Sequence, residues 1–520
     1  MKYTRFAAAA AAIFCALAPA SAGAQALTSL QSVSVQYNTR KATVRPEGEL
    51  KAKIDEIDQQ IAAARRLGQN AELRRLMAKG MTLLNGREWT DALDYTTSLT
   101  IRTEHVVADS GKPLTVRLEQ LYSPAIELDR ALSAHALLRT RPVAAAVGQT
   151  PPPQQVVKDL GRFDGVARDL RESPYFMDLD AHDVADGTYQ LAIEVMDDSR
   201  SLGAATLVVN FRKGLDAEVA QLEEGAKRAP ANLRADILFP VDRMRNVNRG
   251  RLELRTFDPD KDFASADMVL TSAKAGKNPF ERKTGDFKRH YTLESANEIM
   301  PYHMYVPTTY DGSRAFPLII ALHGLGGTED SFFDGYDKAF PPLAERHGYI
   351  VAAPLGYRVD GGYGWGVGNP PADPATRQSR ERSEQDVMQV LQIVRQTYKI
   401  DPNRIYLMGH SLGAIGTWLI APKYPDIWAA ISPISGQGAP ETLARITRVP
   451  EIVVHGDDDR TVNVRGSRTM VAKMKELGIE YKYIEVPGGS HGGVPAPNFP
   501  AIFDFFDAHK KGAAATDHQQ

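Results

Sequence analysis

The sequence predicts an α/β protein whose C-terminal half is built on a doubly wound, mostly parallel sheet, preceded by a helical segment and a small β-sandwich-like module. From about residue 290 onward, continuous apolar runs alternate with segments of helical period. Continuous apolar runs are typical of parallel strands that are covered by helices on both faces. Between residues 96 and 214, apolar residues instead recur at every second position, which is typical of half-buried antiparallel strands.

The N-terminus has the pattern of a bacterial-type secretory signal. Lys2 and Arg5 precede an apolar run over residues 6–19, and small residues follow. The run is shorter than the roughly 20 residues that cross a bilayer. We therefore expect residues 1–24 to be a signal peptide and the product to be secreted or periplasmic, without a membrane span.

Composition excludes several classes of site and partner. The only cysteine is Cys15, inside the signal, so we expect no disulfide, thiolate metal site or Cys nucleophile in the mature chain. The formal net charge of −2 indicates no general basic field, and we expect no nucleic-acid partner.

Residues 27–95 are predicted to form a helical hairpin. Ile54, Ile57 and Ile61 lie on one helical stripe, Gly68 interrupts the pattern, and a second amphipathic stretch follows up to residue 84. The lysines and arginines of this segment are expected on its solvated face.

The next segments are a β-rich module over 96–214 and a helical linker region over 215–285. In the module, residues 189–195 alternate after an Asp-Gly turn, and 205–211 is expected to be the return strand of a hairpin. In the linker region, Pro240 is expected to break the helical pattern. Residues 274–289 are interpreted as a linker.

The catalytic domain is predicted over residues 286–512, and residues 513–520 as a disordered tail. Strands are expected at 317–324, 349–356, 404–411, 428–436, 451–459 and 481–488, and helices near 336–347 and at 384–398, 412–424, 464–476 and 499–510.

The strand 404–411 ends in the motif Gly409-His410-Ser411-Leu412-Gly413, and a helix is expected to follow. A G-x-S-x-G match is weak by itself. The strand–turn–helix context is typical of a nucleophile elbow, in which glycines relieve a crowded bend around the serine.

Two further reactive residues follow strands in the order Ser…Asp…His. Asp459 ends the strand 451–459, and His491 follows the last strand. In an open α/β sheet, reacting groups gather past the carboxyl ends of strands. We expect Ser411, His491 and Asp459 to form a catalytic triad, with Asp457 and Asp458 as alternatives for the acid.

The loop LHGLGG (322–327) is expected to complete the site. Its backbone N–H groups, with the one after the nucleophile, are placed to bind an oxyanion, and Leu325 and Leu412 are the expected donors. Trp365 is a candidate for lining the substrate pocket. His410 is expected to point away from the cleft. His323 and His455 are expected to pack and to bond loops.

These stretches resemble the α/β-hydrolase superfamily, and within it the secreted esterases grouped with feruloyl and acetylxylan esterases and polyhydroxybutyrate depolymerases. The matching stretches are "YHMYVPTTYDGSRAFPLIIALHGLGG", "DVMQVLQIVRQTYKIDPNRIYLMGHSLGAIGTW" and "YPDIWAAISPISG". The resemblance covers roughly residues 290–510. It implies a serine esterase that forms an acyl-enzyme on a small-molecule or polymer-linked ester, without metal or cofactor. Leu325 stands where the depolymerases usually carry a cysteine, which weakens the depolymerase interpretation.

Two alternatives stay open. A serine peptidase of the prolyl-oligopeptidase type shares this fold and triad, although nothing in the sequence repeats at the length of a propeller blade. The other is a protein that binds a glycan or a partner through the β-rich module, with the hydrolase domain as an accessory.

Overall fold

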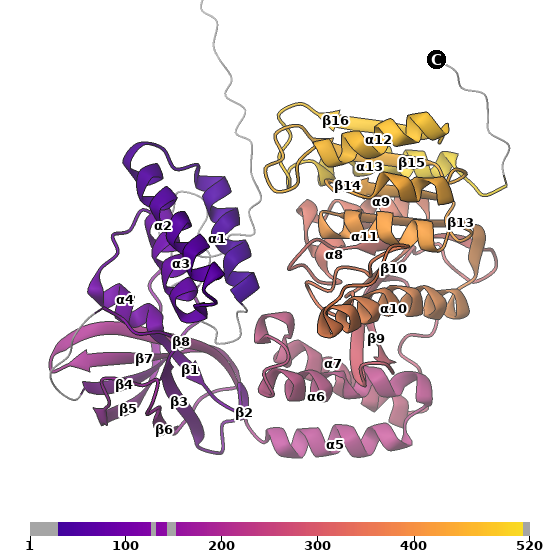
Figure 1. The fold of residues 1–520 in the computed structure, drawn as a ribbon. Coiled ribbons are helices and arrows are strands. Elements are labelled where there is room, and N and C mark those ends of the chain that lie inside the picture. Colours follow the sequence, from indigo (N-terminus) through magenta and orange to yellow (C-terminus); the bar gives the residue numbers. More distant parts are fainter. Residues whose placement is uncertain (1–29, 126–131, 143–151, 513–520) are drawn as a thin grey trace, which may run out of the picture. The chain divides into compact units, whose positions relative to one another are not determined.

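The computed structural model describes residues 30–125, 132–142 and 152–512 (Figure 1). The predicted signal peptide and C-terminal tail lie outside these residues. The chain divides into two compact units, one up to Thr271 and one from Ser272 onward, and each is described by itself. Among the described residues, no helix combines the length and apolarity needed to cross a membrane.

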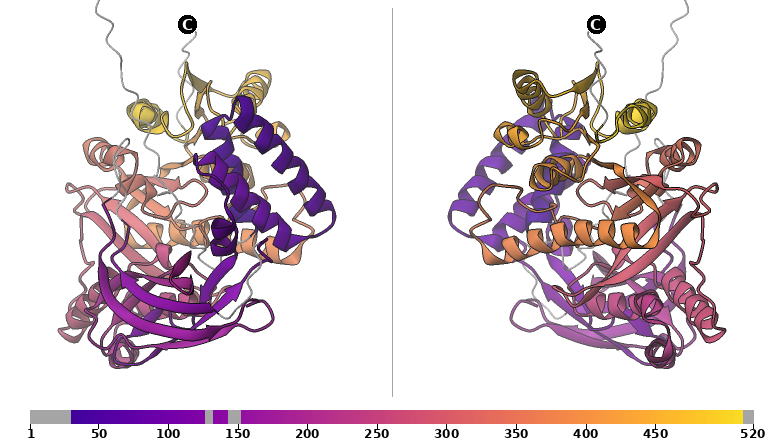
Figure 2. Two further views of the ribbon diagram at one scale, coloured as in Figure 1. Left: turned by 90° about the vertical axis from the view of Figure 1, so that its left-hand side faces the viewer. Right: turned by 90° about the vertical axis from the view of Figure 1, so that its right-hand side faces the viewer.

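Four helices begin the N-terminal unit (Figure 2): α1 (Leu30–Val44), α2 (Gly48–Arg66), α3 (Asn70–Leu84) and α4 (Asp91–Ser98). The predicted hairpin corresponds to α2 and α3, whose apolar stripes pack together. The prediction of a hairpin alone was wrong, because α1 joins the same core through the buried ring of Tyr37. That ring packs so closely on Gly80 that an added Cβ there would lie 2.5 Å from it.

Two sheets follow and share one apolar core. The first has the strand order β1-β3-β6 and the second β2-β8-β7-β4-β5. Strands β7 and β8 pair as the predicted antiparallel hairpin. The strands are β1 (Leu99–Arg102), β2 (Val107–Asp109), β3 (Leu114–Gln120), β4 (Leu132–Arg139), β5 (Val156–Val166), β6 (Tyr175–Leu179), β7 (Gly187–Asp197) and β8 (Arg200–Arg212).

Three helices come next: α5 (Leu215–Arg228), α6 (Arg234–Asn248) and α7 (Pro259–Lys274), with the short 3-10 turns η1 (Ala231–Leu233) and η2 (Leu254–Thr256). The break predicted at Pro240 was wrong, because Pro240 lies inside α6. Its neighbours Phe239 and Val241 are buried, so tertiary packing holds the helix despite the missing backbone N–H.

The C-terminal unit is built on one eight-stranded sheet with the order β16-β15-β14-β13-β11-β12-β10-β9. The strands are β9 (Gly285–Leu293), β10 (Glu298–Val306), β11 (Phe316–Leu322), β12 (Ile350–Pro354), β13 (Ile400–His410), β14 (Ala430–Ile434), β15 (Glu451–Gly456) and β16 (Tyr481–Val486). Strands β11 to β16 run parallel, and β9 and β10 form an antiparallel hairpin at one edge. The predicted α/β class with a mostly parallel sheet is confirmed.

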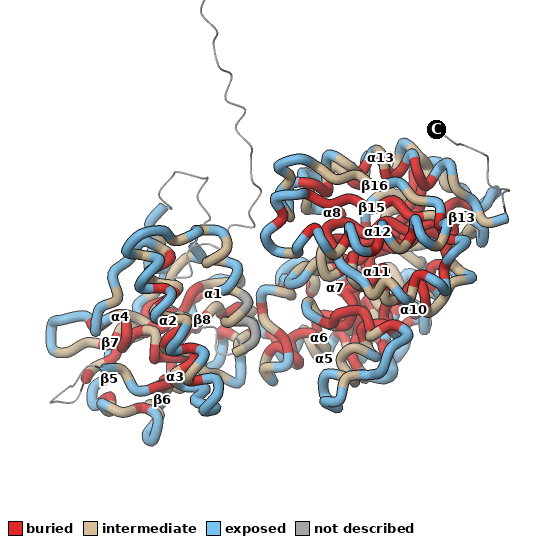
Figure 3. The backbone as a smooth tube through the Cα atoms, turned by 45° about the horizontal axis from the view of Figure 1, so that its top comes forward, coloured by how far each residue is buried: buried red, intermediate tan, exposed pale blue. Residues whose placement is uncertain are grey.

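Alternate residues of the central strands supply two cores, one on each face of the sheet. Leu318 and Ile320 of β11 pack with the helices α10 (Pro374–Thr397), α11 (Leu412–Ile420) and α12 (Arg465–Leu477). Ile319 and Ala321 pack with α9 (Phe340–His347) and α13 (Pro495–Ala508). This double burial explains the continuous apolar runs in the sequence, and the strands appear largely red in Figure 3.

Two helix predictions in this unit need correction. Helix α10 begins at Pro374, ten residues before the predicted start, because its first turns are polar and carry no apolar stripe. Its start is set by Asp373, whose side chain accepts the backbone N–H of Thr376. The single helix predicted near 336–347 is divided into the turn η3 (Tyr336–Lys338) and α9, and the short helix α8 (Ser331–Asp334) precedes them. The remaining 3-10 turns are η4 (Ala421–Lys423) and η5 (Pro440–Arg445).

Candidate active site

Ser411 occupies a sharp turn between β13 and α11. Its backbone is left-handed (φ 58°, ψ −115°), a conformation that a non-glycine residue adopts only when its surroundings hold it. A Cβ added at Gly409 would lie 2.3 Å from the backbone of Gly413, and one at Gly413 would lie 1.9 Å from the carbonyl oxygen of Leu322. Both glycines of the motif are therefore required sterically, which distinguishes this turn from a chance G-x-S-x-G match.

The loop after β11 lies directly beside Ser411. Strands β11 and β13 are neighbours, whereas β12 lies on the far side of β11, so the order in which strands are added to the sheet reverses at β11. Ligands of open α/β sheets bind at such switch points. A Cβ added at Gly324 would lie 3.3 Å from Cβ of Ser411. Among the described residues, the backbone N–H groups of Leu325 and Leu412 have no hydrogen-bond acceptor.

His491 and Asp459 meet at the same edge of the sheet. Nδ1 of His491 lies 2.7 Å from Oδ2 of Asp459, and Oδ1 of Asp459 accepts the backbone N–H groups of Thr461 and Val462 at 2.9 Å each. The loops after β15 and β16 approach closely, since a Cβ added at Gly456 would lie 2.0 Å from the Gly489 carbonyl oxygen. The structure therefore brings together the predicted acid and the predicted base.

The two alternative aspartates face elsewhere. Asp457 accepts the backbone N–H of Gly488 at 2.6 Å, and Asp458 pairs with Arg460 at 2.7 Å. Asp459 is the aspartate whose carboxylate bonds His491 and whose side chain is buried.

A second histidine, His455, also contacts Asp459. Its Nε2 lies 3.2 Å from Oδ2 of Asp459 and 3.0 Å from the Val462 carbonyl oxygen, while Nδ1 lies 2.7 Å from the hydroxyl of Ser467. Burial raises the pKa of Asp459, but hydrogen bonds from His455 and His491 outweigh it and hold that pKa well below its usual range. The carboxylate is thus kept ionised opposite His491. The sequence predicted only that His455 packs and bonds a loop.

His410 does not point away from the site, so that prediction was wrong. Its ring centroid lies 4.8 Å from that of His491, and Nε2 donates to the His491 carbonyl oxygen at 3.0 Å. The hydroxyl of Tyr336 lies 2.8 Å from its Nδ1. Tyr336 was missed because nothing near it in the sequence connects it to residue 410. Burial, followed by the charge of His491, lowers the pKa of His410 to about 3.

Trp365 lies on a tightly held loop after β12. Tyr363 donates its hydroxyl to the His323 carbonyl oxygen at 3.0 Å, and Arg380 donates to the Gly364 carbonyl oxygen at 3.0 Å. The Trp365 ring is half-buried, with Nζ of Lys423 5.4 Å from its centroid. The loop is thereby joined to the loop after β11 (322–327) through His323. That Trp365 lines the pocket stays a prediction.

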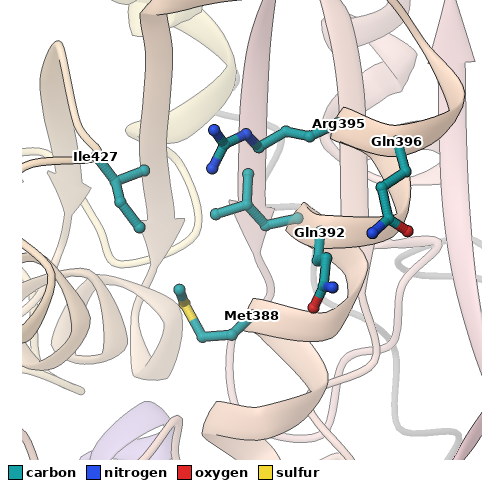
Figure 4. A pocket seen from close by; sticks show the side chains of 6 residues that line it. Met388, Gln392, Arg395, Gln396 and Ile427 are labelled. Carbon is teal, nitrogen blue, oxygen red and sulfur yellow. The ribbon is translucent and has the colours of Figure 1, made fainter.

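A cavity of about 500 Å³ lies near the amino ends of β13 and β14 (Figure 4). It is lined by the C-terminal half of α10 and by Ile427, which precedes β14. Both segments lie at the amino ends of the strands, whereas Ser411 follows a carboxyl end. The cavity is therefore separate from the candidate active site.

Comparison with a family model places a resemblance in the C-terminal unit. Residues 294–470 match the esterase family model, described as putative esterase. A feruloyl esterase B of Talaromyces funiculosus is 28% identical over 134 residues, which cover 26% of this chain and 35% of that protein. A probable acetylxylan esterase A of Neosartorya fischeri is 27% identical over 173 residues, covering 33% of this chain and 45% of that protein. The chain thus aligns with less than half the length of these relatives.

A solved thermostable esterase is 18% identical, with a TM-score of 0.37, and the match covers 80% of this chain and all of that one (100%). The predicted resemblance to the α/β-hydrolase esterases is confirmed by the family model and the relatives.

Proposed function

We propose that this chain is a secreted serine hydrolase that cleaves carboxylic esters through Ser411, His491 and Asp459 by way of an acyl-enzyme. The observation that carries the proposal is the 2.7 Å contact between His491 and Asp459, at the edge of the sheet where Ser411 occupies its left-handed turn. The match to the esterase family and to feruloyl and acetylxylan esterases supports the reaction class.

In the first half of the reaction, Oγ of Ser411 attacks the acyl carbonyl while Nε2 of His491 takes its proton. Asp459 holds the Nδ1–H of His491, which leaves Nε2 free to act as the base, and its carboxylate stabilises the imidazolium that forms. The tetrahedral intermediate collapses, the carbon–oxygen bond to the alcohol breaks, and His491 returns the proton to the leaving alcohol. The acyl group remains on Ser411.

In the second half, water attacks the acyl-enzyme with His491 again as the base, and the acid leaves with Ser411 restored. In both halves the negative oxygen is bound by the backbone N–H groups of Leu325 and Leu412, which have no other acceptor among the described residues. Each such donor stabilises the transition state by on the order of 3 kcal/mol.

We infer secretion, or export to the periplasm, from the signal pattern of residues 1–24. The substrate is a small-molecule or polymer-linked ester.

A panel of p-nitrophenyl esters beside aminoacyl p-nitroanilides tests the function. We expect the purified chain to hydrolyse the esters and Ser411→Ala to reduce kcat to background with the fold retained. The matched control is Ser313→Ala. Ser313 precedes the amino end of β11, whereas Ser411 follows the carboxyl end of the neighbouring parallel strand β13. Faster turnover of the anilides would favour the peptidase instead, and full activity of Ser411→Ala would refute the assignment.

A further inference from the structure

Three successive residues of the turn η3 have left-handed backbones: Tyr336 (φ 51°), Asp337 (φ 57°) and Lys338 (φ 55°). None of them is glycine, and each such residue is strained. Strain of this kind persists only where surrounding contacts over-determine the conformation, and it gathers at functional sites. The contacts made by this turn therefore indicate what it is for.

The turn presents the side chain of Tyr336 to the candidate active site. Its ring packs against Phe332 and Phe499, with centroids 5.3 Å and 5.5 Å away, and its hydroxyl lies 2.8 Å from Nδ1 of His410. His410 directly precedes Ser411 in the chain. The aromatic contacts fix the ring, so the hydroxyl is held in one place.

The hydrogen-bond partners of His410 determine its protonation state. Nε2 faces the backbone carbonyl oxygen of His491, which can only accept, so Nε2 must carry a hydrogen. With Nε2 as the donor, a neutral ring has its lone pair on Nδ1, and the hydroxyl of Tyr336 donates to it. The burial of His410 also favours the neutral ring.

A neutral His410 matters because of its distance from His491. The two ring centroids are 4.8 Å apart. In the proposed mechanism His491 becomes an imidazolium, and a positive neighbour at that distance would oppose the proton transfer. The hydrogen bond from His410 also fixes the backbone of His491, and with it the direction in which the imidazole approaches Ser411.

We propose that Tyr336 is a positioning residue for His491 and acts through His410: its hydroxyl selects the tautomer of His410 that holds the His491 backbone. The role rests on the proposed function, because it has an effect only if His491 is the base. Among the described residues, Asp459, His455 and Tyr363 are titratable groups that also interact with these side chains.

Tyr336→Phe tests the role, because it keeps the ring and its aromatic contacts and removes one hydroxyl. We expect kcat for a p-nitrophenyl ester to fall about 10-fold with KM unchanged, as for one lost hydrogen bond that acts on the reacting geometry. The acid limb of the kcat/KM profile should move to lower pH, because a His410 that takes up a proton disfavours the positive charge of the neighbouring His491 imidazolium. The matched control is Tyr305→Phe, which removes a hydroxyl bonded to Glu345 in the same unit and should leave kcat unchanged.

Wild-type kcat in Tyr336→Phe, or a change in KM alone, would overturn the positioning role. Absence of ester turnover in the wild-type chain would instead refute the proposed function and the role with it. If Tyr336→Phe does not fold, a crystal structure of the wild-type chain decides: a Tyr336 hydroxyl beyond hydrogen-bond reach of Nδ1 of His410 overturns the role.

Discussion

Nδ1 of His491 and Oδ2 of Asp459 lie 2.7 Å apart, although 32 residues separate them in the chain. Each follows a different parallel strand, β15 or β16, and these strands are neighbours at one edge of the sheet. The fold therefore fixes the pair in one place, where His491 also contacts His410, the residue that precedes Ser411 in its strained turn.

The first prediction concerns the acid. Asp459→Asn removes the charge opposite His491. The backbone N–H groups of Thr461 and Val462 hold the amide oxygen, so the NH2 group faces Nδ1 of His491 in place of an acceptor. We therefore expect kcat to fall by about 10⁴-fold, as in other triads. Asp458→Asn is the matched control, because Asp458 pairs with Arg460, and should retain activity within about twofold. Steady-state kinetics of both variants decide. Equal losses would indicate that charge alone, rather than the contact with His491, is what matters.

The second prediction concerns the turn at Ser411. An alanine at Gly413 would place its Cβ 1.9 Å from the Leu322 carbonyl oxygen, so the backbone must shift. We expect Gly413→Ala to lower the free energy of unfolding by about 3 kcal/mol and to abolish ester hydrolysis. At Gly368 the nearest atom to an added Cβ is 3.9 Å away, and Gly368→Ala should change neither property. Denaturant unfolding and an ester assay measure both. Wild-type stability in Gly413→Ala would contradict the crowded turn.

The third prediction concerns pH and stability. Burial raises the pKa of Glu451 to about 8, although a hydrogen bond from the Trp418 indole at 2.9 Å lowers it in part. In the unfolded chain a glutamate has a pKa of about 4.3. Because the folded-state pKa is the higher one, the fold retains the proton at neutral pH, and stability falls as pH rises from about 4.3 towards 8.

Glu451→Gln keeps an oxygen that can accept the Trp418 indole and removes this titration. We expect its free energy of unfolding to equal that of the wild-type chain at pH 4 and to exceed it at pH 8. Tryptophan fluorescence suits the measurement, since three of the four tryptophans, Trp365, Trp418 and Trp428, lie in the C-terminal unit. If the wild-type chain instead became more stable than Glu451→Gln as pH rises, Glu451 would be ionised and stabilising in the fold.

The fourth prediction concerns the substrate pocket. If Trp365 lines it, Trp365→Ala should raise KM for an aromatic ester about 10-fold, with a smaller effect on kcat, because the contact is made in the ground state and the transition state alike. Trp365 is half-buried, so we expect the variant to fold. An unchanged KM would show that the ring only packs the loop against Lys423.

The sequence was sufficient to predict the candidate site residues that belong to a local pattern. Ser411 lies in a five-residue motif after an apolar run, and Asp459 and His491 each follow another such run. The carboxyl ends of parallel strands lie at the same end of a sheet, so strand prediction was enough to assign these three residues to the loops at that end.

Contacts that depend on tertiary packing could not be predicted in this way. Tyr336 contacts His410 through a turn of three left-handed, non-glycine residues, which has no sequence signature. The polar start of α10 lacked a periodic pattern, and the antiparallel edge strands β9 and β10 precede the alternation that revealed the parallel ones. His455 was noted in the sequence, but its contact with Asp459 follows from the bend of the loop after β15.

The most direct test of the proposed nucleophile is covalent labelling with a fluorophosphonate, followed by peptide mass mapping. We expect one equivalent of label on Ser411 in the wild-type chain, no label in Ser411→Ala, and loss of ester hydrolysis in step with labelling. Label on another serine, or undiminished ester hydrolysis by a chain fully labelled at Ser411, would contradict the account.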